Sequence, residues 1–133
     1  MNDLIVRIAT PDGEAFSGEA KSILVKTTEG DVQVMRGHTD YFAALGTGRA
    51  KLALCDGTER LAACSGGFIT VSGGEVSVVA TTFEFSDTID LARAETAREN
   101  AEALLSAAKE QRDIELAKAK LSRALVRIFV AGK

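Results

Sequence analysis

The amino-acid sequence predicts an α+β fold in which an all-β part precedes two helices. Eleven of the 12 glycines and the only proline, Pro11, lie within residues 1–74, where they separate short apolar or alternating segments. After these segments glycine is absent until Gly132, and apolar residues recur at steps of three and four. Such steps are typical of an amphipathic helix, whereas short alternating runs between glycines are typical of strands. The change in period divides the chain into residues 1–86 and 87–133.

The first part contains eight segments with the length and composition of strands. The turn sequences between them are typical of an all-β sandwich or barrel. Two of these turns, Cys55–Thr58 and Ser72–Glu75, place glycine where a tight hairpin needs a positive φ. The segments are LIVRIAT (4–10), KSILVKTT (21–28), VQVM (32–35), YFAAL (41–45), AKLALC (50–55), RLAACSG (60–66), FITVSG (68–73) and EVSVVATT (75–82).

Two apolar stripes in the second part are out of phase with each other. Continuing the first stripe toward the C-terminus reaches Gln111, Glu115 and Lys118, which are polar. The offset predicts two helices joined by a turn in KEQRD, residues 109–113; one long helix with a slipped seam is the alternative. Both stripes are rich in alanine, which buries little apolar area, so we expect a marginal hairpin that can open. The stripes are Ala94, Ala97, Ala101, Leu104 and Ala108, and Ile114, Ala117, Leu121, Ala124 and Ile128.

Composition and charge exclude several classes of function. The net charge of −3 argues against general nucleic-acid binding, which depends on a surplus of lysine and arginine. No apolar run is long enough to cross a bilayer, and the N-terminus lacks the layout of a signal peptide. Cys55 and Cys64 lie in strand-like surroundings without histidine partners, so we expect a reduced, buried pair and no metal site. These features predict a cytoplasmic protein without direct membrane insertion.

Catalytic motifs are not found. His38 is the only histidine and has Asp40 nearby, but a triad also needs an oriented nucleophile, and no GxSxG pattern is present. The SGGF segment, Ser65–Phe68, lacks the lysine of a phosphate-binding loop and precedes a strand. We therefore expect no catalytic residues.

The segment IDLARA, residues 89–94, predicts a helix start, and we expect Ser86 or Asp87 as its cap and Asp90 in the first turn. Arg93 then pairs with Asp90 on the same face of the helix. In the second helix two arginines stand four residues apart, at positions 123 and 127, so both project from one face. Folding the hairpin returns them to Asp90 and Arg93, a combination that suits the phosphates and the polar groups of a nucleotide.

The whole chain resembles the epsilon subunit family of F-type ATP synthases. The resemblance rests on Glu29-Gly30 followed by Gly37-His38, on SGGF followed by VSVVA, and on IDLARA opening an alanine-rich helical region. The chain departs from the family where Arg36 stands in place of a proline before the glycine-histidine pair.

The resemblance implies a non-catalytic, central-stalk rotor subunit with an N-terminal antiparallel β-sandwich (1–86) and a regulatory two-helix hairpin (87–133). It implies that the sandwich binds the gamma subunit and rests on the c-ring, peripherally at the cytoplasmic face of the cell membrane. It also implies that the extended hairpin enters the alpha/beta catalytic head and blocks ATP hydrolysis. The residues expected at the lower partner contact are Arg36, Gly37, His38, Thr39 and Asp40.

No cofactor is required, but the resemblance implies ATP as a regulatory ligand of the folded hairpin. An arginine that the family places in the first helix is Asn100 here, and Arg98 projects about 200° away from it. Two other functions stay open: a free β-sandwich binding module with a dimerising helical tail, and an enzyme that uses His38. The residues expected at the ATP site are Glu84, Ile89, Asp90, Arg93, Ala94, Arg123 and Arg127.

Overall fold

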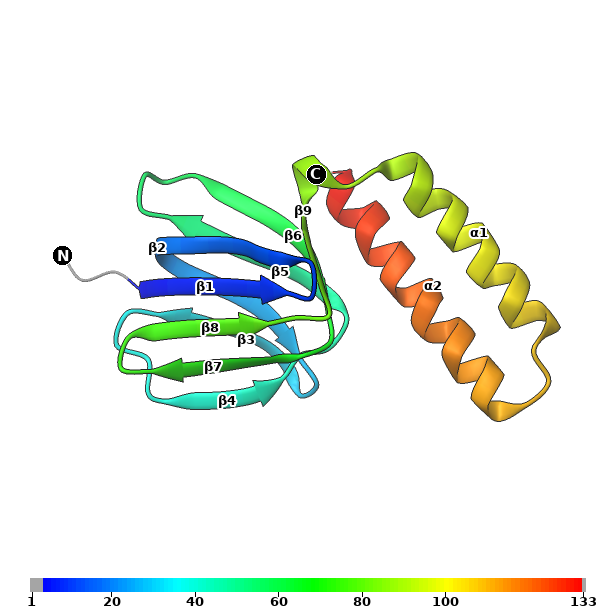
Figure 1. Ribbon diagram of the computed structural model, residues 1–133, viewed down its shortest axis with the longest axis horizontal. Coiled ribbons are helices and arrows are strands. Elements are labelled where there is room, and N and C mark those ends of the chain that lie inside the picture. The colour runs from blue at the N-terminus through cyan, green and yellow to red at the C-terminus, as the bar shows by residue number, and fades with distance from the viewer. Residues whose placement is uncertain (1–3, 133) are drawn as a thin grey trace.

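Nine strands within residues 4–132 form one connected sheet that folds over itself into two layers (Figure 1). The computed structural model describes residues 4–132; residues 1–3 and 133, at the outer ends of the two predicted parts, lie outside the described residues. The strands are β1 (Leu4–Thr10), β2 (Gly13–Thr27), β3 (Gly30–Met35), β4 (Tyr41–Ala44), β5 (Gly48–Leu54), β6 (Glu59–Ser65), β7 (Phe68–Ser72), β8 (Glu75–Val79) and β9 (Thr82–Phe85).

The long strand β2 connects the two layers. Its first half pairs with β1 and continues the order β4-β7-β8-β1-β2, and its second half pairs with β3 and β5, which leads on to β6 and β9. The predicted β-sandwich is therefore confirmed. One pair differs from the antiparallel expectation: β1 and β8 run parallel, from Ile5 opposite Glu75 to Ala9 opposite Val79. Parallel neighbours need a long connection, and here most of the sandwich lies between them.

The core lies between the two layers and follows from strict alternation along the strands. In β1, Leu4, Val6 and Ile8 are buried while their neighbours are exposed, as expected for a strand with one face on a core. Both predicted glycine turns are present. Gly73 and Gly74 have φ of 59° and 83° between β7 and β8, the pair of positive angles that a two-residue hairpin turn requires.

The C-terminal part is a helical hairpin of α1 (Leu91–Ala107) and α2 (Gln111–Ala131). The chain leaves the helical conformation between them, so the two-helix prediction is confirmed and the single long helix is excluded. Helix α2 lies between α1 and the sandwich (Figure 1). Neither helix is long and apolar enough to span a membrane.

Small residues form the seam of the hairpin. The buried helical residues are Ala94 and Ala101 on α1, and Ala117, Ala124 and Val130 on α2. The predicted stripe is wrong at Leu104, which is 50% exposed, while Leu105 is half-buried. Leu105, four residues after Ala101, lies closer to the buried face of the helix than Leu104, which is three residues after it.

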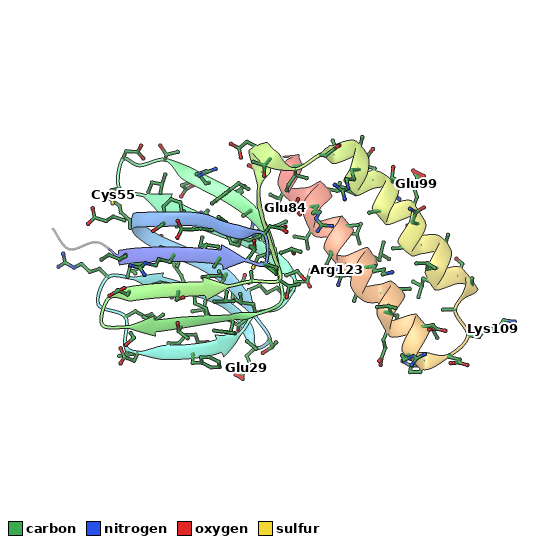
Figure 2. All side chains as sticks on the ribbon, in the orientation of Figure 1. Glu29, Cys55, Glu84, Glu99, Lys109 and Arg123 are labelled. Carbon is green, nitrogen blue, oxygen red and sulfur yellow. The ribbon has the colours of Figure 1, made fainter. Side chains whose placement is uncertain are left out.

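The prediction of two buried cysteines is half wrong. Neither cysteine forms a disulfide within residues 4–132, but only Cys64 is buried, on β6, whereas Cys55 is exposed. Cys55 follows the last residue of β5, so it belongs to the turn at the end of the sandwich remote from the helices (Figure 2).

Candidate functional site

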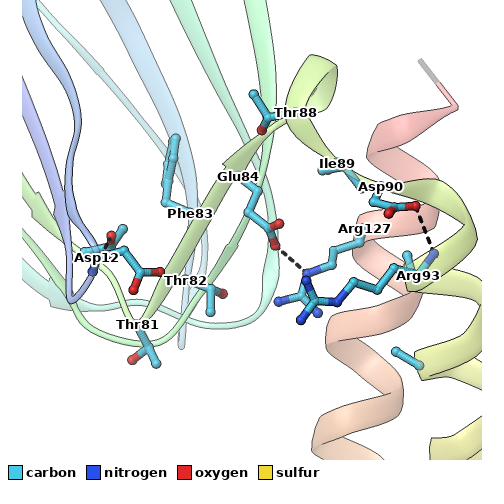
Figure 3. A pocket seen from close by; sticks show the side chains of 13 residues that line it. Asp12, Thr81, Thr82, Phe83, Glu84, Thr88, Ile89, Asp90, Arg93 and Arg127 are labelled. Carbon is cyan, nitrogen blue, oxygen red and sulfur yellow. Dashed lines mark hydrogen bonds and ion pairs between the residues drawn. The ribbon is translucent and has the colours of Figure 1, made fainter.

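A cavity of about 470 Å³ lies where the sandwich, the interdomain linker and both helices meet (Figure 3). Its walls come from the β1–β2 turn, the start of β9, the linker before α1, the first turns of α1 and one residue of α2. Six of the seven residues predicted for a nucleotide site line this cavity, although they come from segments up to 43 residues apart. They are Glu84, Ile89, Asp90, Arg93, Ala94 and Arg127.

Asp90 begins helix α1 as its N-cap. Its Oδ1 accepts a hydrogen bond from the Arg93 backbone N–H at 3.1 Å, and its carbonyl oxygen accepts from the Ala94 N–H at 3.0 Å. The expectations that Ser86 or Asp87 caps the helix, and that Asp90 lies in its first turn, are therefore wrong. Residues Ser86–Thr88 form a separate 3₁₀ turn, η1, because the chain must change direction before the helix can start.

Glu84 and Arg127 connect the sandwich to α2. Glu84 points out of β9 between the buried Phe83 and Phe85, and its Oε1 accepts a hydrogen bond from Arg127 Nε at 2.5 Å (Figure 3). The two side chains are 38% and 26% exposed. A charge-assisted hydrogen bond in such a partly dry position is among the stronger polar contacts in proteins. The pair closes one side of the cavity.

Arg123 lies one helical turn before Arg127 but does not line the main cavity. It lines a small neighbouring cavity together with Cys64, Ser65 and Thr82, and Arg127 borders both cavities. Burial raises the pKa of the Cys64 thiol to about 12, so this thiol is not a nucleophile for the site. Arg123 therefore stands behind Arg127 as seen from the main cavity.

Asn100 and Arg98 take no part in the cavity wall. Asn100 is exposed on α1, and Arg98 Nη1 donates to Glu102 Oε1 at 3.0 Å, one turn further along the same helix. Arg98 thus does not supply the arginine that the resemblance implied near position 100.

Apart from Glu84, the residues that form the sandwich wall of the cavity were not predicted from the sequence. Thr10 and Asp12 reach it from the β1–β2 turn, and Thr81 and Thr82 reach it from the start of β9. The Thr10 hydroxyl holds its turn by donating to the Gly13 carbonyl at 3.1 Å and accepting from the Asp12 N–H at 3.2 Å. The sequence marks this segment only as a turn, and nothing local predicts that it faces a helix some eighty residues later.

The wall residues suit a ligand with an anionic end and a polar end. Arg93 and Arg127 offer guanidinium groups, which bind phosphates and carboxylates in a bidentate manner. Asp12 and Asp90 offer carboxylates that can accept hydrogen bonds from hydroxyl or amino groups. Among residues 4–132 no group of three or more histidine, cysteine or acidic side chains is arranged to hold a metal ion.

The segment expected at a partner contact, residues 36–40, lies in the β3–β4 loop at the end of the sandwich remote from the helices (Figure 1). His38 Nδ1 lies 2.7 Å from the Thr39 carbonyl oxygen, and its ring meets Tyr41 edge-on at 5.7 Å. Asp40 Oδ1 accepts instead from the Gly73 N–H at 3.2 Å. His38 and Asp40 thus have separate local partners and do not form a catalytic dyad.

Family models match both parts of the chain. One described as "ATP synthase, Delta/Epsilon chain, beta-sandwich domain" matches residues 3–86, and one described as "ATP synthase, Delta/Epsilon chain, long alpha-helix domain" matches residues 87–132. The chain is 39% identical over 129 residues to an ATP synthase epsilon chain of Ruminococcus albus, covering 96% of each protein. It is 36% identical over 133 residues to that of Bacillus pumilus, covering 100% of each.

Two solved structures share the fold. A chain of the Euglena gracilis mitochondrial ATP synthase superposes with a TM-score of 0.84 at 21% identity, covering 100% of this chain and 83% of that one. A chain of the central stalk and c-ring of the Tetrahymena thermophila mitochondrial ATP synthase superposes with a TM-score of 0.70 at 13% identity, covering 96% of each. The arrangement of sandwich and hairpin is therefore shared with chains of assembled synthases.

Proposed function

This chain belongs to the delta/epsilon chain family of ATP synthases as an epsilon subunit, and we propose that it is non-catalytic and that its folded hairpin binds ATP. The observation that carries the proposal is the cavity at the junction of sandwich and hairpin. Its wall combines Glu84 of β9, the helix start Ile89–Ala94 and Arg127 of α2. Such a wall exists only while the hairpin is folded against the sandwich.

In the proposed mode of binding the arginines hold the phosphates. Arg93 and Arg127 enter from the two helices and can approach one polyphosphate from two sides. The carboxylate of Asp90 is left to accept from a base or ribose group, a role that its N-cap bond to the Arg93 N–H already orients. Arg123, behind Arg127, adds positive charge without touching the main cavity.

Regulation follows from differential binding to two states of the hairpin. Release of α2 from the sandwich separates Arg127 from Glu84 and takes the site apart, so ATP binds the compact state and not the extended one. A ligand shifts such an equilibrium only through its difference in affinity between the states, about 1.4 kcal/mol for each tenfold. The extended hairpin would then be free to meet the alpha/beta catalytic head and block hydrolysis.

The proposed partners bind at opposite ends of the folded molecule. The β3–β4 loop with residues 36–40 lies at the end of the sandwich remote from the helices (Figure 1), where contact with the gamma subunit and the c-ring leaves the hairpin unobstructed. The subunit would thus lie peripherally at the cytoplasmic face of the membrane. Co-purification with a gamma subunit tests this placement, and failure to bind any gamma subunit would favour a free binding module.

The ATP site is tested by isothermal titration calorimetry of Mg-free ATP into the wild-type chain and two matched variants. Arg93→Ala removes a guanidinium group from the cavity, whereas Arg98→Ala removes one that pairs with Glu102 outside it. We expect the heat of binding to be lost in Arg93→Ala and kept in Arg98→Ala. Equal heats for all three proteins would overturn the site.

A further inference from the structure

A side chain of the sandwich packs against the short linker that joins the sandwich to the hairpin. Only five residues separate Glu84 on β9 from Asp90 at the start of α1, and Ser86–Thr88 among them form the 3₁₀ turn η1. The conformation of this short segment decides how the two walls of the cavity face each other. Any contact that holds the segment also holds the site.

Arg60 makes two contacts with this linker from strand β6. Its guanidinium carbon lies 3.7 Å from the centroid of the Phe85 ring, and its Nη2 lies 3.7 Å from Asp87 Oδ1. Strand β9 pairs with β6 in a register that sets Phe85 opposite Ala62. Two residues further along that register Asp87 would stand opposite Arg60, but β9 has already ended. The Arg60 side chain therefore contacts β9 and the linker at the point where backbone pairing between β6 and β9 ends.

We propose that Arg60 is a positioning residue that clamps the linker and keeps the two walls of the ATP site in register. Its relevance to ATP rests on the proposed function, whereas its hold on the hairpin does not. Phe85 links Arg60 to the interior of the sandwich, because the ring is 6% exposed and packs edge-to-face against Phe83 at 5.3 Å. Phe83 in turn lines the cavity. On the other side of the linker, the Thr88 hydroxyl donates to the Phe85 carbonyl at 2.8 Å and fixes the turn.

The stacking on Phe85 outweighs the ion pair with Asp87. Asp87 is 72% exposed and its oxygen lies 3.7 Å from the guanidinium nitrogen, and exposed pairs of this kind contribute little. A guanidinium group over the face of a buried ring is less screened and fits the ring as a planar ion, which an ammonium group does not. Arg60→Lys should therefore keep only part of the effect, and Asp87→Asn should change little.

Hydrogen–deuterium exchange of the ligand-free chain tests the clamp without any nucleotide. The amides of Arg93 and Ala94 report the helix start, because both donate to Asp90. We expect their exchange to become about tenfold faster in Arg60→Gln and about threefold faster in Arg60→Lys, with Asp87→Asn close to wild type. The matched control is Lys51→Gln, which breaks the Lys51–Glu59 pair on the neighbouring strands and should leave these amides unchanged.

Calorimetry then tests the link to the site. ATP should bind Arg60→Gln about tenfold more weakly than Lys51→Gln, and Arg60→Lys should lie between them. Equal exchange in Arg60→Gln and Lys51→Gln would overturn the clamp, and faster exchange with unchanged ATP affinity would overturn the positioning role. If the wild-type chain binds no ATP, the proposed function is wrong. The exchange comparison still shows whether Arg60 holds the linker. If Arg60→Gln unfolds the sandwich, the graded comparison of Arg60→Lys with Lys51→Gln decides both points.

Discussion

Removing either partner of the Glu84–Arg127 pair should loosen the hairpin from the sandwich. The pair joins β9 to α2 by a 2.5 Å hydrogen bond between side chains that are 38% and 26% exposed. Hydrogen bonds to charged groups contribute about 1.5–3 kcal/mol when dry, whereas exposed ion pairs contribute about 0–1 kcal/mol. A partly exposed pair should lie between these ranges, at about 1–1.5 kcal/mol. Four of the five buried helical residues are alanines, which bury little apolar area, so a polar contact of this size should affect docking measurably.

A double-mutant cycle measures this contribution directly. Glu84→Gln, Arg127→Gln and the double variant are compared by hydrogen–deuterium exchange of α2 amides in the absence of ligand. Loss of about 1–1.5 kcal/mol should raise the released fraction roughly fivefold to tenfold in each single variant, and the double variant should be little worse. The exposed Arg98–Glu102 pair of α1 is the control cycle, with an expected coupling of about 0.3–0.5 kcal/mol. Additive effects of Glu84→Gln and Arg127→Gln, within about 0.3 kcal/mol, would show that the two side chains do not stabilise each other.

The further predictions concern two glycines, the two cysteines and the N-cap residue Asp90. Gly67 has φ of 91° and an added Cβ would collide with the carbonyl oxygen at the end of β8, so Gly67→Ala should lower the free energy of unfolding by about 3 kcal/mol or more. Gly73→Ala, at φ of 59° with open space around it, should lower it by only about 1–2 kcal/mol in the same urea titration. Iodoacetamide at about pH 8 should alkylate Cys55 and spare Cys64, because burial raises the Cys64 thiol pKa to about 12 and only the thiolate reacts. Mass spectrometry of the folded chain measures the labelling at each cysteine. Equal labelling of the two would show that the Cys64 thiol is not protected. Asp90→Ala should destabilise the start of α1 by about 1 kcal/mol through loss of the N-cap, seen as faster amide exchange there, whereas Asp90→Asn should keep most of that stability.

The sequence predicted the fold well wherever local signals decide it. Glycine turns such as Ser72–Glu75 and the shift in helical period at residues 109–113 are properties of a few neighbouring residues, and both predictions are confirmed. The errors arise where tertiary packing decides. Leu104 and Leu105 are equally apolar and adjacent in the sequence, and only the folded structure shows that Leu105 is the less exposed of the two. The parallel pairing of β1 with β8 likewise depends on contacts between distant segments.

The candidate site shows the same division. Its helix side, from Ile89 to Ala94, could be predicted because one short motif contains it. On its sandwich side Glu84 was expected only from the resemblance, and Thr10 and Asp12 could not be predicted because they reach the cavity only after β1, β2 and β9 are assembled. The boundary between residues 1–86 and 87–133 stays a prediction about domains, and ATP as the ligand stays a proposal.

ATP should stabilise the folded hairpin, and an ATP titration followed by hydrogen exchange measures this stabilisation. The Ala94 amide donates to the Asp90 carbonyl within the proposed site, so its exchange follows release of the helix start. If ATP binds the compact state alone, the free energy of releasing the helix start should rise with ATP concentration. At concentrations above the dissociation constant the rise should be about 1.4 kcal/mol for each tenfold increase in ATP. The rise should vanish in Arg93→Ala and persist in Arg98→Ala. Exchange at Ala94 that does not change with ATP concentration in the wild-type chain would mean that ATP does not stabilise the folded hairpin.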